Sequence, residues 1–187
     1  MYLNSINAPI DIWGVGTNLV TAKGDPNLSG VYKMISIEKN GKFIPKMKIS
    51  NNIEKSTLPD QKEVARIYLN GQMIFDFIFL KEEKDKIKNH LNLRKEFTIF
   101  HPIQENVFKI IKQYDDFEFL IHTVLENGKL CKGYESSLNN IRNKTKLDLG
   151  RLEHTYRRII NPHIYKVSIS KNLRKLRNKL MKDNKSN

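Results

Sequence analysis

Apolar and polar residues alternate along four stretches in the first half of the chain. One short turn sequence lies between the first and second stretches, and another lies between the third and fourth. Residues 31–38 and 43–49 flank Asn40-Gly41, and residues 64–69 and 72–80 flank Asn70-Gly71. Alternation with a period of two predicts half-buried strands, and Asn-Gly between two such runs predicts a tight hairpin. The pattern therefore predicts an antiparallel sheet of at least four strands.

The stretch 72–80 is apolar on both of its faces. Phe75, Phe77 and Phe79 share one face, and the opposite face is apolar apart from Asp76. A strand of this kind lies in the middle of a sheet or is covered on both sides. We expect Asp76 to have a buried hydrogen bond or a charge partner rather than a catalytic role.

Shorter patterns fill the middle of the chain. Residues 97–100 form an apolar run that ends before Pro102, and residues 117–125 form a further strand pattern before Asn127-Gly128. The charged stretch 81–95 predicts either a solvated loop or a short exposed helix. The Asn-Gly pair predicts a third hairpin-type turn.

Two helices are predicted in the last quarter. Apolar residues recur at steps of three and four from Leu138 to Ile159, after a Ser136 or Ser137 N-cap, and Asn161-Pro162 ends the pattern. Residues 165–169 are expected to be extended. Ser170 then caps a final helix whose inward face carries Leu173, Leu176 and Leu180.

Positive charge is concentrated in the same region. The 187-residue chain carries a formal charge of +13, and residues 139–187 hold 14 Lys or Arg against three acidic side chains, a net +11. A nucleic acid, an acidic protein partner and a solvated face each explain such an excess. We favour the solvated face and do not expect nucleic acid, because aromatic residues are not interleaved with the basic ones.

The sequence also limits the cellular compartment and the kinds of site that we expect. No stretch of 18 apolar residues and no signal-peptide pattern is present, and the single Cys131 excludes an internal disulfide. None of the five histidines has the spacing of a metal site. The sequence therefore predicts a cytoplasmic protein with no membrane contact, no metal site and no catalytic grouping.

The apolar run 10–13 predicts a short buried strand, and a glycine-rich turn follows it. Gly14-Val15-Gly16-Thr17 lets the backbone turn sharply and present consecutive N–H groups, to which Thr17 adds a hydroxyl. Such a concave row of donors binds phosphate, and a strand followed by a phosphate loop is typical of the mouth of an α/β barrel. An ordinary turn is the alternative interpretation.

The residues around this turn resemble nicotinate phosphoribosyltransferases. The likeness runs through residues 14–21 and 25–33 and continues with residues 45–50 and 161–165, with weaker agreement over 81–140. It covers only the C-terminal part of such an enzyme. The phosphorylatable histidine, most of the barrel and the N-terminal domain of the family correspond to nothing in this sequence.

The resemblance implies an α+β fold with three regions. Residues 1–30 would be an end-of-barrel segment with the phosphate loop, a remnant of the phosphoribosyltransferase barrel. Residues 31–135 would form the antiparallel β-rich region, and residues 136–187 the C-terminal helices. His163 is expected at a structural junction between the long helix and the last segment.

The resemblance also implies a function. The family joins nicotinate to phosphoribosyl pyrophosphate, with ATP and magnesium, in NAD biosynthesis. Gly14, Val15, Gly16 and Thr17 would hold the 5′-phosphate of phosphoribosyl pyrophosphate or nicotinate mononucleotide. We expect this chain to bind no cofactor by itself, to be inactive alone, and to need a missing N-terminal half or a homo-oligomer, as family members are usually dimers.

Two other functions stay open from the sequence. The chain could be an assembly or binding module that complements a separately encoded N-terminal half. It could alternatively be a basic nucleic-acid-binding domain that works through residues 139–187.

Overall fold

A computed structural model describes residues 6–24, 26–27, 30–50, 55–131, 133 and 137–183. The chain divides into two compact units, Met1–Lys33 and Met34–Asn187. None of the helices among these described residues is long and apolar enough to cross a bilayer.

Among its described residues, the first unit contains one short helix, α2 (Thr17–Val20), with Gly16 at its N-cap. The expected strand at 10–13 is wrong, because these residues are not paired in any sheet. Their side chains face solvent: Ile12 is 87% exposed and Trp13 58% exposed. A single strand cannot satisfy its backbone groups without a neighbour, so this apolar run does not form a strand in the described chain.

The second unit is built on a six-stranded sheet with the order β6-β5-β10-β4-β3-β7. The strands are β3 (Lys62–Leu69), β4 (Gln72–Leu80), β5 (Phe97–Phe100), β6 (Phe108–Ile111), β7 (Asp116–Phe119) and β10 (Val167–Ile169). Strand β10 runs parallel to β4 and antiparallel to β5. The sheet is therefore mixed, whereas the sequence predicted a wholly antiparallel one, because the late segment 165–169 enters its centre.

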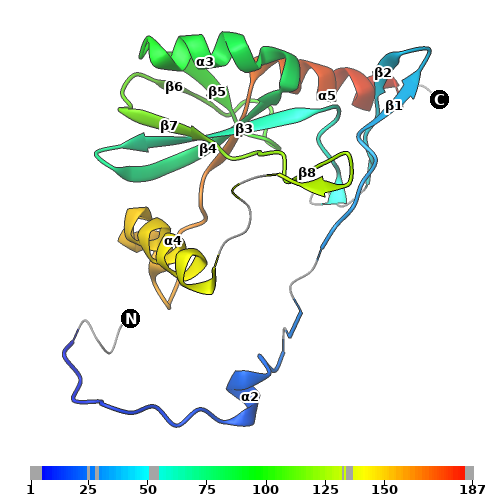
Figure 1. Cartoon of the computed structure of the whole chain (residues 1–187). Coiled ribbons are helices and arrows are strands. Elements are labelled where there is room, and N and C mark those ends of the chain that lie inside the picture. The colour runs from blue at the N-terminus through cyan, green and yellow to red at the C-terminus, as the bar shows by residue number, and fades with distance from the viewer. Residues whose placement is uncertain are drawn as a thin grey trace. The chain divides into compact units, whose positions relative to one another are not determined.

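Strand β4 lies inside the sheet and is packed on both faces, as the sequence predicted, and Figure 1 shows α3 and α5 beside the sheet. On one face, Leu91 of α3 (Lys84–Asn92) packs in a core cluster with Phe75, Phe77 and Phe79. On the other, Leu173 of α5 (Lys171–Asp183) packs with Leu80 and Ile169. The charged stretch 81–95 is thus helical, and a 3-10 turn, η2 (Lys81–Glu83), leads into α3.

All three Asn-Gly turns form, and both residues of each pair have positive φ. This backbone geometry is the reason for the Asn-Gly preference of two-residue hairpins. The first hairpin, β1 (Ser36–Lys39) with β2 (Lys42–Pro45), makes its own two-stranded sheet rather than joining the large one. The third is β8 (Leu125–Glu126) with β9 (Lys129–Leu130), and the strand expected at 117–125 is split between β7 and β8.

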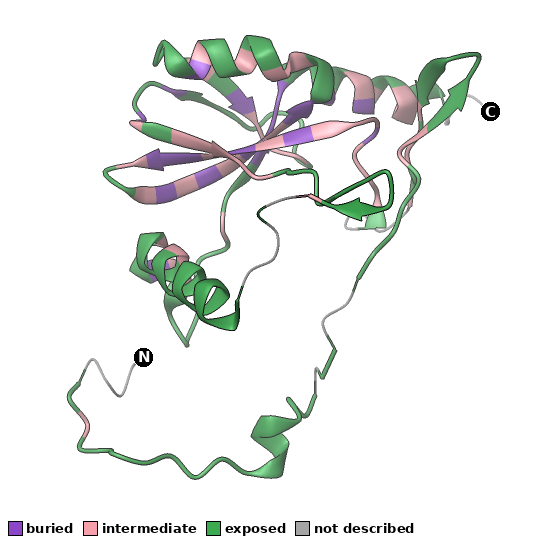
Figure 2. Cartoon of the chain, viewed as in Figure 1, coloured by how far each residue is buried: buried purple, intermediate pink, exposed green. Residues whose placement is uncertain are grey.

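The long helix is shorter than its pattern predicted. Helix α4 (Leu138–Arg151) begins after the N-cap Ser137, whose side chain accepts a hydrogen bond from the N–H of Asn140 at 3.3 Å. It ends before Leu152, which forms a parallel bridge with Met73 of β4. A 3-10 turn, η3 (His154–Arg157), follows. No residue of α4 is buried, and Figure 2 shows the helix almost wholly exposed.

We expect the Ser170→Ala substitution to lower the free energy of unfolding by about 1–2 kcal/mol. The buried Ser170 hydroxyl accepts from the N–H of Leu173 at 3.1 Å and donates to Glu83 Oε2 at 2.7 Å. Urea unfolding followed by circular dichroism measures the change. Ser137→Ala is the matched control, since it caps the exposed α4, and equal losses in the two variants would contradict this account.

Candidate functional site

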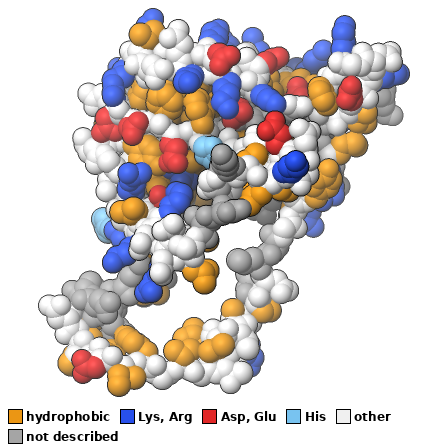
Figure 3. Space-filling view, in the orientation of Figure 1, with side chains coloured by type: hydrophobic (Ala, Val, Ile, Leu, Met, Phe, Trp, Pro, Cys, Tyr) orange, Lys and Arg blue, Asp and Glu red, His pale blue; other side chains and the backbone are white. Residues whose placement is uncertain are grey.

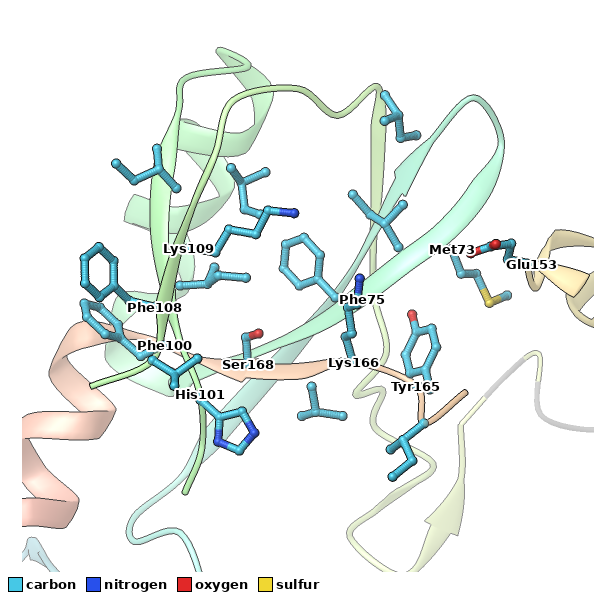
Figure 4. Close-up of a pocket in the computed structure, with 18 of the residues that line it drawn as sticks. Met73, Phe75, Phe100, His101, Phe108, Lys109, Glu153, Tyr165, Lys166 and Ser168 are labelled. Carbon is cyan, nitrogen blue, oxygen red and sulfur yellow. The ribbon is translucent and has the colours of Figure 1, made fainter. Parts of the chain in front are cut away.

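A notch interrupts the six-stranded sheet between β4 and β5. Strand β10 fills the space between them only over three residues, opposite Asp76–Ile78 of β4, and meets β5 only at Ile169↔Phe100. Residues 72–75 of β4 and Ile99 of β5 lie outside these pairs and line a common space. A hollow of about 1000 Å³ lies there (Figure 4). Met73 of β4, which forms the bridge with Leu152, also lines the hollow.

The lining of the notch is mainly apolar. Phe75, Ile99 and Ile111 are buried members of the main core cluster and line the hollow as well. Phe100 and Phe108 line it from the β5–β6 hairpin, with their ring centroids 6.3 Å apart. The core therefore extends to the surface at this point.

Charged groups at the notch are mostly cationic. Lys109, Lys112 and Lys166 line it, against a single carboxylate, Glu153. His101 also lines the hollow, and its Nδ1 accepts from the backbone N–H groups of Ile103 and Gln104 at 3.1 and 3.0 Å. This arrangement places the proton of a neutral His101 ring on Nε2. The site carries a positive charge over an apolar surface.

A partly buried ion pair lies beside the notch. Arg66 of β3 and Asp76 of β4 are direct cross-strand partners. The Arg66 guanidinium donates to both carboxylate oxygens of Asp76, at 2.8 and 2.9 Å, and the Tyr165 hydroxyl donates to Oδ1 at 3.0 Å. The prediction that Asp76 has a charge partner is confirmed.

The same contacts raise the pKa of two side chains, Arg66 and Tyr165. The hydrogen bond to Asp76 raises the pKa of Arg66, so its positive charge is retained. Burial, followed by the negative charge of Asp76, raises the pKa of Tyr165 well above its usual value. Tyr165 therefore stays neutral and remains a donor to the carboxylate across the physiological range.

Aromatic contacts hold the segment that precedes β10. The Tyr156 ring lies 5.4 Å from Tyr165 and 6.3 Å from His163, in edge-on geometry. The N–H of His163 donates to the carbonyl of Thr155 at 3.0 Å. His163 thus lies in the connection between η3 and β10, where the resemblance placed a structural junction.

The predicted phosphate loop lies in the other unit. A Cβ added at Gly14 or Gly16 would meet no atom within 4 Å. The carbonyl of Gly16 accepts from the N–H groups of Leu19 and Val20, both at 3.1 Å. Gly14, Val15, Gly16 and Thr17 thus belong to the first unit, and their role in phosphate binding stays a prediction.

Metal-ligating side chains do not gather in the described part of the chain. Across those residues, no group of three or more His, Cys, Asp or Glu side chains could hold a metal ion. The magnesium that the resemblance implies has no fitting donor set among them.

The second unit has the architecture of an α+β domain with a helix on each face of a mixed sheet. The family described as "Nicotinate phosphoribosyltransferase C-terminal domain" matches residues 61–177, which run from the start of β3 into α5. The chain belongs to this family.

Several relatives are nicotinate phosphoribosyltransferases. The chain is 35% identical to that of Bacillus subtilis (strain 168) over 173 residues, covering 91% of this chain and 34% of the relative. It is 33% identical to that of Dictyostelium discoideum, covering 91% of this chain and 28% of the relative. The chain thus spans about a third of the length of the relatives it matches.

A solved structure shares the fold. The crystal structure of human nicotinic acid phosphoribosyltransferase aligns with a TM-score of 0.52 and 24% identity. The alignment covers 67% of this chain and 24% of that one. At this identity the likeness is evidence for the α+β fold alone.

Sequence reasoning missed the notch. Strand β6 was not predicted, although residues 107–111 are mainly apolar around Lys109. Lys166 and Tyr165 lay in a segment expected only to be extended. The available signal for β6 was this apolar run interrupted by one lysine. Nothing near it in the sequence indicates that the run lies on the same hollow as β4.

Removing the carboxylate of the ion pair is expected to destabilise the protein. In Asp76→Asn the guanidinium of Arg66 keeps only a neutral partner. The two side chains are 23% and 15% exposed, so the loss in unfolding free energy should be about 1–3 kcal/mol. Urea unfolding measures it. Lys144→Met is the matched control, because the Lys144–Asp148 pair at 2.7 Å is exposed and should contribute under about 0.5 kcal/mol. Equal effects would contradict this interpretation.

The raised pKa of Tyr165 predicts an alkaline loss of stability. An unfolded tyrosine loses its proton near pH 10, whereas folded Tyr165 keeps its proton to a higher pH. The stabilising contribution is therefore complete below about pH 10 and is lost as the pH rises through the folded-state pKa. Unfolding free energies of Tyr165→Phe should fall less with alkaline pH than those of the unmodified protein. Tyr32→Phe, at an exposed position, should behave like the unmodified protein.

Proposed function

We propose that this chain works as the C-terminal portion of a nicotinate phosphoribosyltransferase and takes part in NAD biosynthesis. The observation that carries the proposal is the match to nicotinate phosphoribosyltransferases over 91% of this chain and about a third of their length. Within that enzyme the chain contributes the loop Gly14–Thr17 to the 5′-phosphate of phosphoribosyl pyrophosphate or of nicotinate mononucleotide. The loop would be a remnant of the barrel mouth.

The backbone N–H groups of the loop support this role. Among the described residues, the backbone N–H groups of Gly14, Val15, Gly16 and Thr17 donate to no backbone carbonyl. Four consecutive free donors with two glycines among them suit an approaching phosphate. The ribose phosphate must be fixed for phosphoribosyl transfer, since positioning supplies a large part of the rate. These amides would do that part of the work.

Exposed apolar surface supports dependence on a further protein segment. Leu138 and Leu147 of α4 are 84% and 67% exposed, and Trp13, Leu19 and Val20 in the first unit are exposed as well. Figure 3 shows hydrophobic side chains at the surface of both units. Apolar patches of this kind typically mark protein interfaces. We therefore propose that the chain alone does not complete the reaction.

The same surface favours a second role, that of an assembly module for a separately encoded N-terminal half. The excess of Lys and Arg on and after α4 suits an acidic partner better than a second copy of this basic chain. A cytoplasmic location, a dimeric enzyme, and the family's use of ATP and magnesium belong to the same proposal. Those two cofactors would be bound by the remainder of the enzyme.

The loop assignment is tested by titrating the chain with phosphoribosyl pyrophosphate and following backbone amide shifts by nuclear magnetic resonance. We expect shifts at residues 14–17. Gly16→Val should abolish them, because the added side chain would block the approach of a phosphate to the N–H groups. The loop itself tolerates the change, since Gly16 has a φ of −82°, which a valine also adopts, and has open space for the side chain. Gly30→Val, which also has room for a side chain, is the control. Unchanged amides at 14–17 would refute the loop assignment.

An assay with radiolabelled nicotinate, phosphoribosyl pyrophosphate and ATP tests the second part of the proposal. The chain alone should form no nicotinate mononucleotide. Full turnover by the isolated chain would show that it carries a complete active site and would overturn the proposed dependence on a partner.

A further inference from the structure

We infer that the outer edge of β6 is a docking site for an extended segment of another protein, in which acidic residues alternate with apolar ones. The segment would add a seventh strand to the large sheet. The inference rests on the second unit alone. It depends neither on the phosphate loop nor on the activity proposed above.

Strand β6 ends the six-stranded sheet, and β5 is the one described strand that pairs with it. The N–H of His101 donates to the carbonyl of Val107 at 2.9 Å, so this pair is hydrogen-bonded across the hairpin. Bonded pairs alternate along an antiparallel ladder, so the backbone groups of Lys109 also point to β5. Those of Phe108 and Ile110 therefore point away from the sheet.

These outward backbone groups have no partner in the described part of the chain. Phe108 and Ile110 form no backbone hydrogen bond with a described loop, turn or other element. A row of free donors and acceptors at a sheet edge is a template for one more strand. Several peptide-binding domains recognise their ligands in this way, with backbone bonds for affinity and alternate side chains for specificity.

The edge lacks the features that usually protect such a strand. Strand β6 contains no proline, and its four pairs with β5 run without a bulge. Its apolar side chains are open to solvent, since Phe108 is 60% exposed and Ile110 47% exposed. The opposite edge differs, because β7 carries Asp116 and Glu118 and its two phenylalanines pack against the main core cluster.

The two faces of this edge have different chemistry. Phe108 lies opposite Phe100, which packs with Leu173 of α5. Lys109 lies on the other face, and Figure 4 shows the Phe108 and Lys109 side chains on opposite sides of their strand. An added strand would therefore place apolar side chains beside Phe108 and Ile110 and a polar one beside Lys109.

The charge at the edge selects an acidic segment. Lys109 forms no ion pair with any described residue, and the exposed Lys112 follows the strand. Because its backbone bonds to β5, Lys109 would occupy a non-hydrogen-bonded position toward an added strand, where opposing side chains come closest. A glutamate there would form a favourable cross-strand pair. A second copy of β6 would instead bring together lysines of two chains that each carry a formal charge of +13.

The probe is the peptide acetyl-Glu-Val-Glu-Val-Glu-Val-Glu-amide, titrated into the full chain. Nuclear magnetic resonance should show backbone amide shifts at Phe108, Lys109 and Ile110. The same peptide with lysine in place of every glutamate should bind at least about twofold more weakly. Lys109→Glu should reverse this preference. Lys88→Glu makes the same charge change at an exposed position of α3 and should retain it.

Methylated peptides separate strand pairing from charge attraction. Methyl groups on the valine nitrogens remove the donors that face Phe108 and Ile110, and should abolish the shifts. Methyl groups on the glutamate nitrogens are the matched control and should leave binding in place. Ile110→Pro removes the outward donor from the protein itself, at the kind of edge position where a proline is tolerated, and should also abolish the shifts. The same spectra check its fold.

Several results would overturn the inference. These are no binding of the acidic peptide, equal binding of the two peptides, or binding that survives methylation of the valines. Shifts confined to β7 or to the β1–β2 hairpin would place the docking edge elsewhere. Dimerisation of the chain through β6 would show that a second copy, and not an acidic partner, occupies this edge.

Discussion

The sheet of the second unit is held together by a strand of three residues, Val167–Ile169. On one side stand β5 and β6, on the other β4, β3 and β7, and β10 supplies the only ladder between the two groups among the described residues. Ile169 is fully buried and Ser170 donates its N–H to the carbonyl of Ile78 at 2.9 Å. Both the core and the notch depend on this insertion, because the notch begins where the strand stops.

The start of β10 is fixed by polar contacts rather than by further ladder bonds. Tyr165 is anchored to Asp76, whose carboxylate is in turn oriented by Arg66. Buried polar groups of this kind need all their partners, so the three side chains constrain one another. The strand itself begins only at Val167, after these contacts. The space that a longer strand would occupy stays open and becomes the hollow lined by Phe75 and Lys166.

Local signals in the sequence predicted the local features of this fold. The three Asn-Gly turns, the cap at Ser170 and the partner of Asp76 each follow from chemistry within a few residues or within one hairpin. The parallel position of β10 does not, because it pairs residues about ninety positions apart and its three residues carry no periodicity. The notch could not be predicted for the same reason, since its walls come from β4, β6 and the approach to β10.

The early end of α4 and the missing strand at 10–13 show the opposite effect, in which tertiary context overrides a clear local pattern. The helical pattern continues past Leu152, but Leu152 bridges to Met73 instead. Residues 10–13 have strand character but no neighbouring strand in the described chain. Pattern alone predicts which face of an element is apolar, and not whether the rest of the chain covers that face.

The late position of β10 in the chain also determines the order of events during synthesis. Every other strand of the large sheet leaves the ribosome before residues 167–169 are made, so the β3–β4 and β5–β6 hairpins must first exist without the strand that joins them. Until then Leu80 and Phe100 lack their packing partner Ile169, and two unpaired strand edges are exposed. The nascent protein is therefore most prone to aggregation, and most in need of a chaperone, just before its last helix emerges.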